Sequence, residues 1–82
     1  MLARVKLFGP MRQAVGQSEL ALLLKADPPT CAALRQEVRA SEPRLAEMLA
    51  GCRFAVNGRF AGEELRLAEG DEIALIGFVS GG

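Results

Sequence analysis

The sequence predicts an α+β fold in which one main helix packs across a mixed sheet of four or five strands. Three observations carry this prediction. Alternating apolar residues mark strands at both ends of the chain, a single amphipathic helical stripe lies between them, and 82 residues suffice for one compact domain. We assign this domain to residues 1–76 and treat residues 77–82 as a flexible tail that ends in two glycines.

The first two strands are expected to form a hairpin. Ala3, Val5 and Leu7 alternate with Arg and Lys, the pattern of a half-buried strand. Residues 11–15 are expected to form one helical turn or a packed loop that ends at a glycine. Residues 18–24 then form a second strand with three leucines on one face.

The main helix is expected over residues 31–40. Thr30 follows two prolines and suits the N-cap position. The apolar stripe of this helix consists of Cys31, Leu34 and Val38. The remaining side chains of the helix are expected to be solvated, namely Arg35, Gln36, Glu37 and Arg39.

A second short helix is predicted just after the first. Pro43 suits its first position, and Gly51 suits its end. Leu45, Met48 and Leu49 would form its inner face.

The remaining strands follow a strong turn signal. Residues 53–56 and 59–61 flank Asn57-Gly58, a pair typical of two-residue hairpin turns. Leu65 and Leu67 are expected to anchor the connection that follows to the core.

The last strand is expected to be central. Residues 72–76 are apolar on both faces, which is typical of a strand flanked by neighbours on both sides. Two strands, a helix and then more strands, with the last strand in the middle beside the first, describe the ubiquitin-like β-grasp fold.

Composition excludes several classes of function. Ten basic and ten acidic residues balance, which argues against a nucleic-acid-binding protein. No apolar run is long enough to span a membrane, and no signal peptide is recognised, so we expect a cytoplasmic protein. Without histidine, and with only Cys31 and Cys52, the chain is expected to hold no metal or cofactor and to lack a nucleophile–base pair. We read both cysteines as structural.

The sequence ends in Gly81-Gly82, which contributes little to stability because glycine has no side chain to pack. Glycines without a Cβ can enter a narrow cleft. A terminal carboxyl group has a reference pKa of about 3.3–3.7 and is therefore ionised at neutral pH. The tail suggests a carboxylate that is presented to another protein.

Four segments together resemble molybdopterin synthase small subunits, the MoaD-type sulfur carriers. They occur in the expected order and cover the whole chain: Phe8-Gly9-Pro10-Met11-Arg12-Gln13-Ala14-Val15-Gly16, Val56-Asn57-Gly58, Leu67-Ala68-Glu69-Gly70-Asp71-Glu72-Ile73 and Val79-Ser80-Gly81-Gly82. One departure is Gly77-Phe78, where the family commonly has two prolines.

The resemblance implies a carrier rather than a catalyst acting alone. An E1-like enzyme would use ATP to adenylate the carboxylate of Gly82, and a sulfur-donor protein would supply sulfur to form a thiocarboxylate. The large subunit of molybdopterin synthase would then take up the tail, and the sulfur would pass to cyclic pyranopterin monophosphate in molybdenum cofactor biosynthesis.

The resemblance also implies which residues act. Gly82 would carry the sulfur, and Gly81 would give access to the partner's active site. Partner contacts are expected at Phe8, Arg12, Phe60, Phe78, Val79 and Ser80, whereas Leu75 is interpreted as core. Phe78 is equally compatible with an anchor in the partner's groove and with packing on the protein's own sheet.

Three alternatives remain open at this stage. A ThiS-type sulfur carrier for thiazole synthesis shares the fold and the Gly-Gly ending, although such chains are typically shorter. A ubiquitin-like modifier would join Gly82 to lysines. A pure interaction module would not need Gly81-Gly82 at all.

Overall fold

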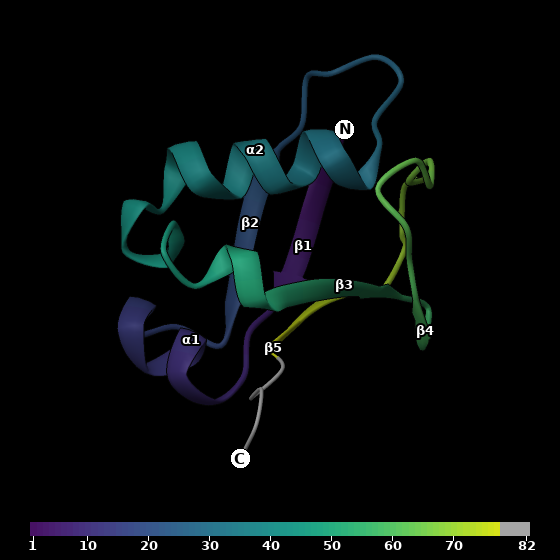
Figure 1. Ribbon diagram of the computed structural model, residues 1–82. Helices are drawn as coiled ribbons and strands as arrows, with labels where there is room; N and C mark the ends of the chain where they lie inside the picture. Colours follow the sequence, from purple (N-terminus) through teal and green to yellow (C-terminus); the bar gives the residue numbers. More distant parts are fainter. Residues whose placement is uncertain (78–82) are drawn as a thin grey trace.

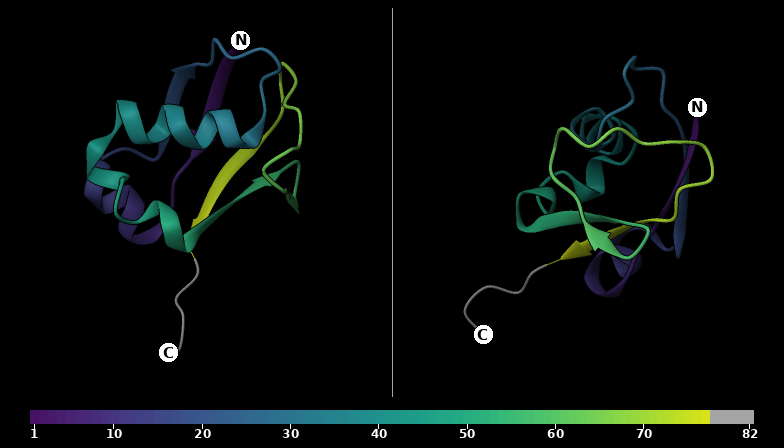
Figure 2. Two further views of the ribbon diagram at one scale, coloured as in Figure 1. Left: turned by 45° about the horizontal axis from the view of Figure 1, so that its top comes forward. Right: turned by 90° about the vertical axis from the view of Figure 1, so that its right-hand side faces the viewer.

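The computed structural model describes residues 1–77. A five-stranded mixed sheet has the order β2-β1-β5-β3-β4, and the main helix, α2, crosses one face of it (Figures 1 and 2). β1 (Leu2–Lys6) and β5 (Ile73–Gly77) pair in parallel at the centre, and the other neighbouring strands are antiparallel. The predicted α+β class, the ubiquitin-like β-grasp fold and the central last strand are confirmed.

The first hairpin contains a short helix between its strands. β1 pairs with β2 (Glu19–Leu23), and α1 (Gly9–Val15) forms two turns between them, where one turn or a loop was predicted. Gly16 ends α1 in the left-handed conformation, with φ of 79°, and its N–H donates to the carbonyl of Arg12 at 2.8 Å. This is the usual role of a glycine at a helix C-terminus.

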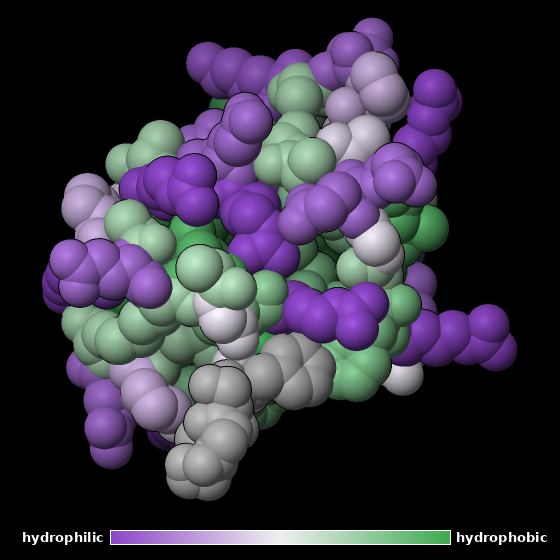
Figure 3. All heavy atoms as spheres, in the orientation of Figure 1, coloured by the Kyte–Doolittle hydropathy of each residue, from purple (hydrophilic) through white to green (hydrophobic). Residues whose placement is uncertain are grey.

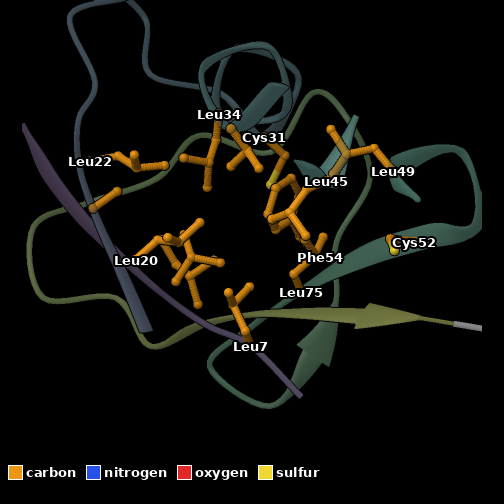
Figure 4. Close-up of a cluster of buried hydrophobic side chains, with 14 of the residues drawn as sticks. Leu7, Leu20, Leu22, Cys31, Leu34, Leu45, Leu49, Cys52, Phe54 and Leu75 are labelled. Carbon is orange, nitrogen blue, oxygen red and sulfur yellow. The ribbon is translucent and has the colours of Figure 1, made fainter. Parts of the chain in front are cut away.

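α2 (Cys31–Ser41) follows the predicted pattern at its start and along its apolar stripe. The hydroxyl of Thr30 accepts a hydrogen bond from the N–H of Ala33 at 3.2 Å, which satisfies one of the free donors at the helix N-terminus. All three predicted stripe residues are buried. Figure 4 shows Cys31 and Leu34 pointing from α2 into the core.

Two separate 3₁₀ turns replace the predicted second helix. They are η1 (Pro43–Leu45) and η2 (Leu49–Gly51), and i to i+3 backbone bonds hold both. The segment is short and is bounded by a proline and a glycine, so it has room only for single turns. Leu45 and Leu49 are buried as predicted, while Met48 is only partly buried.

The second hairpin joins β3 (Cys52–Val56) to β4 (Arg59–Phe60). Both turn residues have positive φ, 53° at Asn57 and 83° at Gly58, as the tight two-residue turn requires. The predicted turn is therefore confirmed.

The connection from β4 to β5 corrects one prediction. Leu67 is buried, but the side chain of Leu65 is 43% exposed and does not anchor the connection. The main chain of Leu65 has that role instead, because its carbonyl accepts the N–H of Cys31 at 3.0 Å. Leu65 therefore secures the loop to the first turn of α2 by its backbone.

The core lies between α2 and the sheet. Its buried side chains are apolar, and no polar or charged residue within 1–77 is buried (Figure 4). Leu75 is fully buried, as interpreted from the sequence. The opposite side of the sheet, which we call the open face, carries alternate residues of the same strands, including Lys6, Arg53, Ala74 and Ile76.

Candidate functional site

The site predicted from the sequence falls largely beyond the described part of the chain. Gly81 and Gly82, with Phe78, Val79 and Ser80, lie outside residues 1–77. The structure does describe the strand that leads to them and the surface around its end. The candidate site is therefore built from the end of β5.

Pairing with β3 holds the end of β5 in place. Gly77 is opposite Cys52 of β3 and Ile76 is opposite Arg53, whereas β1 pairs with the start of β5, at Ile73 and Ala74. A central strand paired on both edges is among the most rigid elements of a small sheet. The residue that precedes the tail therefore has a defined position.

An apolar groove surrounds this position, and we call it the β5-end groove. It has a volume of about 360 Å³. Its lining residues come from α1 and its N-cap, from the 3₁₀ segment, and from β3 and β5: Phe8, Gly9, Pro10, Met11, Met48, Gly51, Cys52, Ile76 and Gly77. Figure 3 shows apolar side chains near the end of the described chain. Among residues 1–77, no charged side chain lines the groove.

Glycine at position 77 keeps part of this groove open. A Cβ atom placed there would lie 3.5 Å from Cε of Met11 and 3.9 Å from Sγ of Cys52. These are ordinary van der Waals distances, so alanine would fit, but it would occupy space that is otherwise free.

The Cys52 thiol forms part of the groove wall. Its Sγ lies 3.0 Å from the carbonyl oxygen of Met48, to which it donates, and 3.3 Å from Sδ of Met11. Burial raises the pKa of Cys52, and burial followed by the charge of Glu63 raises the pKa of Cys31. Both thiols are therefore protonated at neutral pH and are poor nucleophiles.

Two of the predicted partner contacts are exposed aromatic rings. Phe8 is 50% exposed at the start of α1 and lines the β5-end groove, whereas Phe60 is 53% exposed on β4 at the far edge of the sheet. The guanidinium carbon of Arg53 lies 5.1 Å from the centre of the Phe60 ring. Arg12, on α1, is exposed.

Sequence reasoning missed the role of Arg35, which was predicted to be solvated. Its side chain is only 19% exposed. The guanidinium donates to the carbonyl oxygens of Leu49 at 2.7 Å and Cys52 at 3.0 Å, and forms an ion pair with Glu63 at 2.9 Å. It also lies 5.5 Å from the centre of the Phe54 ring. Arg35 thus ties α2 to the chain segment that carries Gly51 and Cys52 into the groove wall.

A second polar network holds the loop that precedes β5. The amide nitrogen of Asn57 donates to Asp71 at 3.0 Å, and the other carboxylate oxygen of Asp71 accepts the N–H of Ala68 at 2.7 Å. The side-chain oxygen of Asn57 accepts the N–H of Glu72 at 2.9 Å. The bond from Ala68 and then that from Asn57 lower the pKa of Asp71. This network fixes the point at which the chain enters β5.

Residues 1–77 offer two further negative observations. Nowhere in this part of the chain do three His, Cys, Asp or Glu residues gather closely enough to bind a metal ion. None of its helices has the length and apolar character to cross a bilayer.

The topology and the strand-borne tail define a small ubiquitin-like β-grasp protein. The chain belongs to the ThiS family, which matches residues 5–82. This family comprises small ubiquitin-like sulfur carriers. No curated protein sequence matches the chain.

Several solved structures share the fold. SAMP1 from Haloferax volcanii has a TM-score of 0.86 at 22% identity, with all of both chains covered. A putative molybdopterin converting factor subunit 1 from Pyrococcus furiosus has a TM-score of 0.84 at 24% identity, covering 96% of this chain and 99% of that one. A complex of subunits 1 and 2 of the molybdopterin-converting factor from Helicobacter pylori matches with a TM-score of 0.69 and 28% identity over all of both chains.

Proposed function

We propose that this protein is the sulfur-carrier small subunit of a molybdopterin synthase. The observation that carries the proposal is the family match over residues 5–82, which extends through Gly81-Gly82. The central position of β5 supports it, because the tail then starts from a fixed point on the domain. The 28% identity with a structure that contains subunit 1 of a molybdopterin-converting factor favours this pathway over the alternatives.

The chemistry requires no side chain of this protein. A carboxylate oxygen of Gly82 attacks the α-phosphorus of ATP on an activating enzyme, and pyrophosphate leaves. A sulfide equivalent from a donor protein then attacks the acyl carbon and displaces AMP, which leaves a thiocarboxylate. Its sulfur attacks cyclic pyranopterin monophosphate, and hydrolysis returns the carboxylate. Acid–base groups and oxyanion stabilisation come from the partners.

Three partners follow from this scheme: an E1-like adenylating enzyme, a sulfur donor and the synthase large subunit. The Helicobacter pylori structure, in which subunits 1 and 2 form a complex, supports the large-subunit partner. We place the domain's contribution to docking at the exposed rings of Phe8 and Phe60 and at Arg12, whose backbone N–H donates to the carbonyl of Phe8 at 3.4 Å. Residues 78–80 would contact the channel through which Gly81 and Gly82 reach the active site.

Reconstitution tests the proposal. After incubation with ATP, an activating enzyme and a sulfur source, the intact mass should increase by the difference between sulfur and oxygen, and the change should map to the C-terminal peptide. Addition of the large subunit and cyclic pyranopterin monophosphate should then yield molybdopterin. A chain that lacks Gly82 should form none while keeping its thermal midpoint.

The matched control is Gly62→Ala, a glycine change in a loop. No atom lies within 4 Å of the Cβ that alanine would add there. This variant should transfer sulfur as well as the parent chain. Molybdopterin formation by the Gly82-deleted chain would refute the proposal.

The same experiment separates the alternatives. A thiocarboxylate that supports thiazole formation but not molybdopterin formation would identify a ThiS-type carrier. Isopeptide-linked conjugates to lysines, found by mass spectrometry, would identify a protein modifier. Equal behaviour of the full and Gly82-deleted chains in every assay would leave only an interaction module.

A further inference from the structure

The β5-end groove has the size and chemistry to receive an aromatic side chain. Its wall includes the apolar residues Pro10, Met11, Met48 and Ile76, and its volume is about 360 Å³. An apolar cavity of about 150 Å³ suffices to bind benzene. A single phenyl ring would therefore fit with space for its methylene group.

The chain itself brings such a ring to the groove. Gly77 lines the groove, and the next residue in the sequence is Phe78. The strand register pairs Gly77 with Cys52, and Gly51, the residue before Cys52, also lines the groove and has no side chain to fill it.

The composition of the tail leaves little choice of occupant. Among residues 78–82 only Phe78 has a large apolar side chain, and Ser80, Gly81 and Gly82 have nothing to bury. A side chain that is tethered one residue away has a far higher effective concentration at the groove than a side chain of a separate protein. We propose that the Phe78 ring docks in the β5-end groove of the free protein and anchors the root of the tail.

This docking goes beyond sulfur transfer and does not depend on it. Two consecutive prolines would stiffen a tail through the backbone, whereas Gly77-Phe78 would fix its root through a side chain buried in the domain. Four residues beyond Phe78 reach at most about 14 Å when extended, which limits how far Gly82 can travel from the groove.

Methionine methyl resonances provide a direct test in the free protein. The chain has three methionines: Met11 and Met48 line the groove, and Met1 lies outside it and serves as an internal reference. In the parent chain with ¹³C-labelled methionine methyls, ring currents from Phe78 should shift the groove methyls upfield. Phe78→Ala should abolish that shift and leave Met1 unchanged.

Two controls exclude other sources of the shift. Phe60→Ala removes an equally exposed ring on β4, remote from the groove, and should leave the Met11 and Met48 methyls unmoved. Nuclear Overhauser contacts between the labelled Phe78 ring and these methyls should appear in the parent chain, so the test does not depend on any variant alone. Identical Met11 and Met48 shifts in the parent and Phe78→Ala chains, with no ring contacts, would overturn the docking and leave the groove to a partner's side chain.

Discussion

Replacing Arg35 with methionine should destabilise the domain substantially, although the residue lies outside the apolar stripe of α2. The variant keeps an unbranched stem but loses two hydrogen bonds to carbonyls, at 2.7 and 3.0 Å, the ion pair with Glu63 and the contact with the Phe54 ring. A hydrogen bond to a charged group contributes about 1.5–3 kcal/mol, and partial exposure reduces this to about 1 kcal/mol each here. The ring contact adds about 0.5–1 kcal/mol.

The ion pair adds less than about 1 kcal/mol, because the Glu63 side chain is 53% exposed. The total loss is therefore about 2–4 kcal/mol. In a domain of this size that corresponds to a fall of roughly 10–25 °C in the thermal midpoint, measured by circular dichroism. The thermal midpoint of Arg35→Lys should lie between those of the parent chain and Arg35→Met, since lysine has the charge but not the planar fork that reaches both carbonyls.

Arg39→Met is the matched control. It makes the same chemical change on the same helix, at an exposed residue, and should shift the free energy of unfolding by no more than about 0.5 kcal/mol. If Arg35→Met were as stable as Arg39→Met, the four contacts of Arg35 would not contribute as argued. Introducing Glu63→Gln into the parent chain and into Arg35→Met would isolate the contribution of the ion pair to the free energy of unfolding.

Three further outcomes are expected. Gly16→Ala should cost about 1–2 kcal/mol in chemical denaturation, because φ is 79° there, whereas Gly62→Ala should be nearly neutral. The lowered pKa of Asp71 contributes stability that is present above its ordinary pKa of about 3.9 and is lost as the pH falls through the folded-state value, so Asp71→Asn should flatten the acid limb of the thermal midpoint against pH. The folded state keeps the Cys31 and Cys52 thiols protonated, so stability should fall as the pH rises above about 8.5, and iodoacetamide should label both residues far more slowly in the native than in the unfolded chain, as followed by mass spectrometry. Rapid native labelling at neutral pH would contradict the burial of both thiols.

Local signals predicted most of the fold. The Thr30 cap and the Asn57-Gly58 turn depend on neighbouring residues only, and the structure has both as predicted. Leu65 and Arg35 were misassigned, because their roles depend on contacts that a residue pattern does not contain. The carbonyl of Leu65 meets the start of α2, and Arg35 finds two carbonyls on a distant segment.

The candidate site likewise has residues that the sequence predicted and residues that only the tertiary packing reveals. The apolar residues around the end of β5 are ordinary strand and helix residues in the sequence, and only the packing of α1 against the 3₁₀ segment and β5 turns them into a groove. Phe8 was singled out because it was expected on the sheet surface near the tail, and it does line that groove. Cys52 and Met48 gave no such signal, since a lone cysteine or methionine more often fills a core.

The sheet order has a consequence for how the protein is made. β1 and β2 can pair as soon as both are synthesised, and so can β3 and β4, but neither hairpin contacts the other across the sheet without β5 between them. The strand that joins the two halves is the last to be made, and its partner β1 is the first. Pairing so distant in sequence slows folding and makes it depend on nearly the whole chain. A nascent chain that stops short of β5 therefore lacks a complete sheet, and a folded domain is one in which the base of the tail is already in place.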